Sequence, residues 1–132
     1  MTRREVREQI FQLLFRMEFH DAGEMVEQLQ YLEEANQAIA GKDKEYIEKK
    51  CGDLLALIPE IDEAVNQAAS GWKTTRMGKV DLCIIRLAVY EMRYEEDIPV
   101  KVAINEAVEL AKKYGTDDSS SFVNGVLAKL VI

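Results

Sequence analysis

Arginine side chains are the residues whose type and spacing point most clearly to a ligand. Arg3, Arg4 and Arg7 lie in the first turns of a predicted N-terminal helix. Cations at this end oppose the positive end of the helix dipole, so their placement lowers helix stability. A guanidinium binds phosphate through two parallel hydrogen bonds, so the phosphate of an RNA backbone is the natural ligand for such a cluster. By itself, however, this stretch favours the alternative, a solvated helix start in which Glu5 and Glu8 pair with the arginines.

A second cluster of RNA-binding residue types lies near the C-terminus. Tyr114 follows two lysines, and Phe122 and Asn124 follow a run of serines. Aromatic rings stack on unpaired bases, and hydroxyl and amide groups bind base edges and phosphates. By itself, however, the pattern favours Phe122 as a core residue over a base-stacking one. Gly125 inside a predicted helix indicates either close helix packing or close approach of a ligand, because glycine lowers helix stability.

Residues for catalysis or metal binding do not form a recognisable set. The GxSxG, P-loop and GxGxxG patterns are absent. His20 lies beside Asp21, but a solvated helix end explains this pair better than a general base does. Cys51 and Cys83 are expected to be buried free thiols, since no second ligand pair accompanies them. We expect no catalytic residue, metal or cofactor, with a small helical enzyme built from Arg, Lys and Glu as an alternative.

The composition limits the class of protein. The chain has 132 residues, 48% of them hydrophobic, which predicts one domain spanning residues 1–132. The net charge of −7 argues against a protein that coats nucleic acid indiscriminately, and requires a local basic patch for RNA. An acidic body also attracts a basic protein partner. No apolar run approaches the roughly 20 residues that span a bilayer, and no signal peptide is evident, so we expect a cytoplasmic protein without a membrane partner.

Helical periodicity positions these residues throughout the chain. Thr2 and Glu5 have the spacing of a capping box, which predicts a helix start at the N-terminus. Glycines, prolines and aspartates divide the chain into about seven amphipathic segments, and none alternates like a strand. The sequence therefore predicts an all-α fold of about seven helices in two packed halves, about 1–70 and 71–132. The expected helices end or begin near Gly23, Gly41, Asp43, Pro59, Gly78, Pro99, Gly115 and Asp117 or Asp118.

Several segments resemble the NusB family. Residues 99–115 (PVKVAINEAVELAKKYG) and 122–127 (FVNGVL) closely resemble the family's C-terminal signature. Two further segments resemble the family, namely residues 84–92 (IIRLAVYEM) and 3–8 (RREVRE). Trp72, with Arg76 four residues later, fits its usual place in the family just before the helix that contains residues 84–92. The resemblance covers essentially the whole chain.

The resemblance implies a function as well as a fold. It implies seven helices in two halves and a non-catalytic role in transcription antitermination, chiefly on ribosomal RNA operons. The implied partners are NusE, a small-subunit ribosomal protein, and the boxA element of nascent RNA, with other Nus factors and RNA polymerase contacted indirectly. A second hypothesis is a protein-binding module whose homodimer is the active form.

The resemblance also assigns residues. It implies RNA contacts at Arg3, Arg4, Arg7, Tyr114, Phe122 and Asn124, and NusE contacts at Phe15 and Asp81. Structural roles fall to Asn105, Glu106, Gly125 and Arg86, the last in a buried or half-buried ion pair, with Glu91 or Glu106 as candidate partners. Familiar members have a longer basic N-terminal tail, and Ser120 and Ser121 stand where a basic residue is common. With fewer cations, we expect RNA binding without the partner to be weaker and less sensitive to salt.

Overall fold

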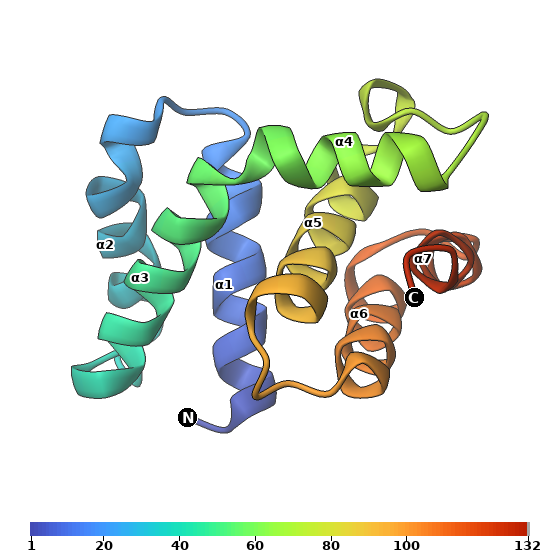
Figure 1. Ribbon diagram of the computed structural model, residues 1–132. Coiled ribbons are helices and arrows are strands. Elements are labelled where there is room, and N and C mark those ends of the chain that lie inside the picture. Colours follow the sequence, from blue (N-terminus) through green and yellow to red (C-terminus); the bar gives the residue numbers. More distant parts are fainter. Residues whose placement is uncertain (132) are drawn as a thin grey trace. The chain divides into compact units, whose positions relative to one another are not determined.

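The computed structural model describes residues 1–131 and places the chain in two compact helical units, Met1–Ala56 and Leu57–Ile132. Within the described residues there are seven α-helices, two short 3₁₀ helices and no strand, which confirms the predicted all-α class (Figure 1). The first unit contains α1 (Arg3–Met17), η1 (Ala22–Glu24), α2 (Met25–Ala35) and α3 (Gly41–Ala56). The second contains α4 (Ile58–Ala68), η2 (Thr74–Arg76), α5 (Lys79–Tyr94), α6 (Val100–Tyr114) and α7 (Ser119–Ala128).

Helix α1 is the centre of the first unit and packs against both α2 and α3 (Figure 1). Its predicted apolar stripe is buried, including Ile10 and Leu13, which have no exposed surface. Across the α1–α2 contact, the Arg16 Nε–H donates to Gln28 Oε1 at 2.9 Å, and the guanidinium lies 5.3 Å from the centre of the Tyr31 ring. The helical spacing of Phe19 in the sequence predicts that it widens this stripe, and that prediction is wrong. The helix ends at Met17, and Phe19 lies in the following turn with 62% of its surface exposed.

The connection between α2 and α3 is longer than the sequence suggested. Helix α2 ends at Ala35 instead of continuing to Gly41, and Gly41 is the first residue of α3. The Asn36 side chain accepts a hydrogen bond from the Ala38 N–H at 3.1 Å, which stabilises a turn in place of another helical turn. Gly41 has φ +56°, a left-handed conformation that glycine adopts without strain.

Helix α5 is the most buried element of the second unit. It packs against α4, α6 and α7, and α6 also packs against α7 (Figure 1). Ile84, Ile85 and Leu87 on α5 have 0–1% of their surface exposed. Burial of each such side chain contributes roughly 1.5–3 kcal/mol, so this helix supplies much of the apolar stabilisation of the unit. The apolar pattern of the sequence also predicts Val102 on the buried face of α6, but Val102 is 43% exposed, while Ala103 one residue later is buried.

Helix α4 belongs to the second unit. Its residues pack against α5 and η2, and the break between the units lies before it, at Ala56. The sequence placed the break after this helix, near Gly71, because a glycine and a serine interrupt the pattern there. Gly71 has φ +90° and makes a turn inside the second unit.

Candidate nucleic-acid interface

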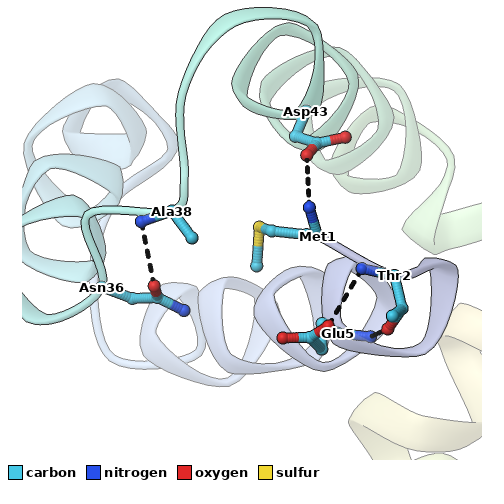
Figure 2. Close-up of polar contacts among 6 residues, drawn as sticks. All are labelled: Met1, Thr2, Glu5, Asn36, Ala38 and Asp43. Atoms are coloured by element: carbon cyan, nitrogen blue, oxygen red, sulfur yellow. Dashed lines mark hydrogen bonds and ion pairs between the residues drawn. The ribbon is translucent and has the colours of Figure 1, made fainter.

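The predicted capping box fixes the start of α1 and thereby the backbone that carries the arginines. The Glu5 N–H donates to the Thr2 hydroxyl at 3.1 Å, and the Thr2 N–H donates to Glu5 Oε1 at 3.0 Å (Figure 2). These two bonds satisfy backbone N–H groups that a helix start otherwise leaves without partners. Arg3 and Arg4 follow at once and are exposed, whereas Arg7 is half-buried one turn later.

The carboxylate of Glu5 is engaged by the cap. The backbone hydrogen bond from Thr2, followed by that from its hydroxyl, lowers the pKa of Glu5 below its usual value. An ionised carboxylate is a stronger acceptor than a neutral one, so the cap is complete when Glu5 is charged. Glu5 thus has a structural role in the same turn as the arginines.

The amino terminus of the chain is held by α3. The Met1 ammonium lies 3.3 Å from Asp43 Oδ2, in the first turn of α3 (Figure 2). A carboxylate in the first turn of a helix is also stabilised by the helix dipole, and Asp43 therefore serves both groups. This contact and the capping box together anchor the two residues that precede Arg3, and the basic end of α1 is a defined surface of the first unit.

The loop between α6 and α7 is closely packed. Gly115 caps α6 with its N–H bonded to the Ala111 carbonyl at 2.9 Å, as the sequence predicted for this position. A Cβ at Gly115 would lie 2.8 Å from that carbonyl oxygen and 2.5 Å from the Ser119 Cβ, so there is no room for a larger residue at this position. The backbone does not require glycine here, because a φ of −95° is accessible to any residue. The Thr116 N–H donates to the buried Ser119 hydroxyl at 2.9 Å.

This packing corrects the predicted cap of α7. Asp118 occupies the N-cap position, as one of the two expected residues, but its side chain makes no capping hydrogen bond. The hydrogen bond from the Thr116 N–H to the Ser119 hydroxyl orders the loop. Asp117 and Asp118 are both exposed.

The sequence left open whether Phe122 is a core residue or an exposed ring. In the structure, Phe122 on α7 is half-buried, which is intermediate between the two. Its ring packs against Trp72, with ring centres 5.3 Å apart and an interplanar angle of 71°. This is the edge-to-face arrangement that aromatic pairs favour. Trp72 is 54% exposed, so the pair carries one ring that solvent reaches. No sequence pattern indicates this contact, because it joins a loop and a helix that are distant in the chain.

Tyr114 and Asn124, the other predicted RNA contacts of the second unit, differ in exposure. Tyr114 at the end of α6 is half-buried, and the Lys113 ammonium lies 5.5 Å from its ring centre, a cation–π distance. Asn124 and Gly125 on α7 are exposed. A Cβ at Gly125 would meet no atom within 4 Å, so close helix packing, one of the two explanations for this glycine, is excluded.

The predicted partner-binding residues lie in different units. Phe15 on α1 is half-buried and contacts two rings, Phe11 at 6.3 Å and the exposed Phe19 at 5.4 Å between centres. Asp81 is half-buried in the first turn of α5, where the helix dipole favours a carboxylate. An aromatic surface on the first unit and an acidic position on the second are therefore both partly accessible.

The half-buried ion pair expected for Arg86 is present, with a carboxylate that the sequence did not suggest. Arg86 Nε and Nη2 donate to the two oxygens of Asp62 at 2.9 and 2.7 Å. The two side chains are 11% and 20% exposed. This bidentate pair joins α4 to α5 and explains an arginine among the buried apolar residues in the middle of α5.

Groups that could support catalysis are sparse. His20 Nδ1 lies 2.7 Å from Glu24 Oε2 instead of pairing with Asp21, and both partners are partly exposed. Cys51 and Cys83 are both buried and form no disulfide, as predicted. Within residues 1–131, no cluster of three His, Cys, Asp or Glu side chains is arranged to hold a metal ion. No helix among them has the length and hydropathy to cross a bilayer.

The helical fold, the signature segments and the arginine-bearing helix start define this chain as a member of the NusB family, whose model matches residues 4–131. A curated relative from Agathobacter rectalis, Transcription antitermination protein NusB, is 54% identical over 129 residues and covers 98% of each chain.

Two solved structures are similar throughout. T. maritima NusB has a TM-score of 0.84 and 35% identity, covering 98% of this chain and 90% of its own. A crystal structure of the antitermination factors NusB and NusE in complex with double-stranded RNA contains a chain with a TM-score of 0.83 and 26% identity. That alignment covers 97% of this chain and 94% of the other.

Proposed function

We propose that this chain is a non-catalytic transcription antitermination factor that binds boxA-type RNA of ribosomal RNA operons together with NusE. The observation that carries the proposal is the match over nearly the whole chain to an antitermination protein at 54% identity. The similar chain in the crystal structure of NusB and NusE with double-stranded RNA supports NusE and RNA as partners. The complex would help RNA polymerase avoid premature termination, with other Nus factors joining it, and would act in the cytoplasm as one RNA-binding domain of residues 1–132.

The RNA-binding surface rests on charge and exposure. Arg3 and Arg4 are exposed on a helix start whose backbone is held by the capping box, and a guanidinium binds phosphate through two parallel hydrogen bonds. Tyr114, Phe122 and Asn124 supply rings and an amide on the second unit for contacts with bases. Because the chain carries a net charge of −7, the cations on these surfaces must act locally.

The proposed NusE surface follows from the same charge balance. A ribosomal protein that binds RNA needs positive charge, and an acidic body attracts such a partner over long range. Asp81 at the start of α5 and Phe15 on α1 are the residues proposed for this contact. A basic partner bound here would add cations to the RNA site, and the joined surface would bind RNA more tightly than either protein alone.

Self-association is a second candidate, favoured by exposed apolar side chains on the first unit. Phe19, Val26 and Tyr31 are 62%, 55% and 47% exposed, so about half or more of each side chain lies outside the core of this unit. A homodimer through these side chains would make the protein a protein-binding module. Sedimentation at several protein concentrations distinguishes the RNA-binding adaptor from the homodimer. The adaptor hypothesis predicts that RNA and NusE change the sedimenting species. The homodimer hypothesis predicts a stable dimer that RNA does not change.

Fluorescence anisotropy tests the proposed function. A labelled boxA-type RNA and a scrambled control are titrated with and without NusE, at two salt concentrations. We expect binding to boxA that strengthens with NusE and weakens with salt. Equal and weak binding to both RNAs under all conditions would contradict the proposal and make the homodimer the leading hypothesis.

A further inference from the structure

The single tryptophan of the chain is held at the surface by an ordered loop between α4 and α5. The backbone N–H of Trp72 donates to the Ala69 carbonyl at 2.9 Å, and Gly71 in this turn has φ +90°. Two residues later the Thr74 N–H donates to Asn66 Oδ1 at 2.8 Å, and the Thr74 side chain is buried. The loop is thus fixed on both sides of Trp72, and its 54% exposure is a feature of the folded unit.

The contact with Phe122 gives the indole a defined position. With ring centres 5.3 Å apart in an edge-to-face arrangement, Phe122 restricts the rotation of Trp72 and leaves more than half of the tryptophan surface open. A large ring held in place loses little conformational entropy when a flat ligand stacks on it. Nucleic-acid bases are ligands of this shape, and stacking on an aromatic side chain accepts any base.

The residues next to Trp72 in the sequence favour a polyanion as the ligand. Residues 64–80 contain no Asp or Glu, although the chain has 24 acidic residues in 132. The same stretch contains three cations that lie exposed in the structure, namely Lys73, Arg76 and Lys79. An acidic protein that keeps one stretch free of carboxylates, with cations beside an exposed ring, matches the composition of a site for single-stranded nucleic acid.

We propose that Trp72 stacks on a base of bound single-stranded RNA and that Lys73 and Arg76 bind the flanking phosphates. The proposal rests on the function proposed above and adds residues to its RNA-binding surface. Trp72 extends the site around Phe122, so a base on the indole lies beside the ring that the sequence already assigned to RNA. Stacking requires unpaired bases, and this surface therefore discriminates single strands from duplexes.

Intrinsic fluorescence reports on the site directly, because the chain contains one tryptophan. Titration of the full chain at low salt with a short boxA-type single strand should change the Trp72 emission, and the same RNA annealed to its complement should change it much less. Trp72→Ala should weaken binding of the single strand by about 5-fold to 150-fold, the range for loss of one stacked base. Trp72→Phe should restore part of the affinity.

A matched control is available on the same unit. Tyr94 is 44% exposed and stacks on Tyr90 with ring centres 5.5 Å apart, but three acidic residues, 95–97, follow it. Tyr94→Ala therefore removes an exposed, ring-supported aromatic whose neighbours are one cation, Arg93, and three carboxylates, and it should leave RNA affinity unchanged. The Lys73→Gln and Arg76→Gln variants should each lower the slope of log affinity against log salt by about 0.7 per phosphate contact.

The outcomes separate this proposal from the proposed function. If the wild-type chain binds no RNA by anisotropy with or without its protein partner, the function itself fails. If it binds RNA while the Trp72 emission stays unchanged and Trp72→Ala binds equally well, the function stands and the stacking role is overturned. An emission change on adding the protein partner but not RNA also overturns it. The wild-type emission decides the question even if the alanine variant folds poorly.

Discussion

Two glycines of the second unit should respond in opposite ways to the same substitution. Gly115 lies in the loop just before α7, and Gly125 lies within α7. Neither of these two glycines has a positive φ. A Cβ at Gly115 would collide with the Ser119 side chain and approach the Ala111 carbonyl to 2.8 Å, whereas at Gly125 it would meet open space. Gly115→Ala should therefore destabilise the protein, and Gly125→Ala should stabilise it.

The magnitudes follow from the local contacts. Moving Ser119 weakens its hydrogen bond from the Thr116 N–H and strains a buried position, which together cost about 2–4 kcal/mol. In α7, replacing glycine with alanine contributes about 0.5–1 kcal/mol of helix stability. At about 2.1 cal/mol/K of unfolding entropy per residue, 1 kcal/mol shifts the Tm of 132 residues by about 4 °C. We expect Gly115→Ala to lower the Tm by about 8–15 °C and Gly125→Ala to raise it by about 2–4 °C.

Thermal unfolding followed by circular dichroism measures both variants against the wild type. Equal Tm changes in the same direction would refute the argument, because it depends on the difference in space around the two glycines. RNA binding by the Gly125→Ala variant adds a second readout. An alanine that stabilises the fold but weakens RNA binding would identify Gly125 as a point of close RNA approach.

Three further substitutions test other contacts. Asp62→Asn removes the charge that pairs with half-buried Arg86 and should lower the free energy of unfolding by about 1–3 kcal/mol in urea titrations, whereas no change would show that other groups suffice for Arg86. Thr2→Ala should cost about 1 kcal/mol at neutral pH through loss of the cap. Because folding lowers the pKa of Glu5, the stability that the wild-type cap contributes is present above the ordinary pKa of 4.5. It is lost as the pH falls through the lower pKa that Glu5 has in the folded protein. The Thr2→Ala variant should therefore lack this loss of stability in acid. Asp81→Asn should weaken NusE binding in calorimetry and lower the Tm only slightly, through loss of the favourable contact with the helix dipole, and unchanged affinity would remove Asp81 from the partner surface.

The helices could be predicted because their determinants are local. The capping box of Thr2 and Glu5 and the cap at Gly115 involve residues within a few positions of one another, and the structure has both. Errors arose where a helix end was set by a nearby side chain. Asn36 forms a turn after α2 that the apolar pattern does not show, and the end of α1 at Met17 leaves Phe19 exposed.

Contacts between distant segments could not be predicted in the same way. Arg86 was expected to form an ion pair because a charged group in an apolar helix needs a partner, but Asp62 lies on another helix. The Trp72–Phe122 contact joins a loop to α7, and no periodicity relates the two residues. Sequence reasoning therefore gives residue types suited to RNA and their helices, while the exposure of each ring depends on tertiary packing.

The most direct test of the central claim is RNA binding by an Arg3→Ala, Arg7→Ala double variant. Anisotropy with boxA-type RNA and NusE is measured across a salt series for the variant and the wild type, alongside thermal unfolding of each. We predict weaker binding and a shallower salt dependence, by about 0.7 in slope per lost phosphate contact, with a similar Tm. Wild-type affinity and salt slope in the folded double variant would contradict the assignment of the start of α1 to RNA.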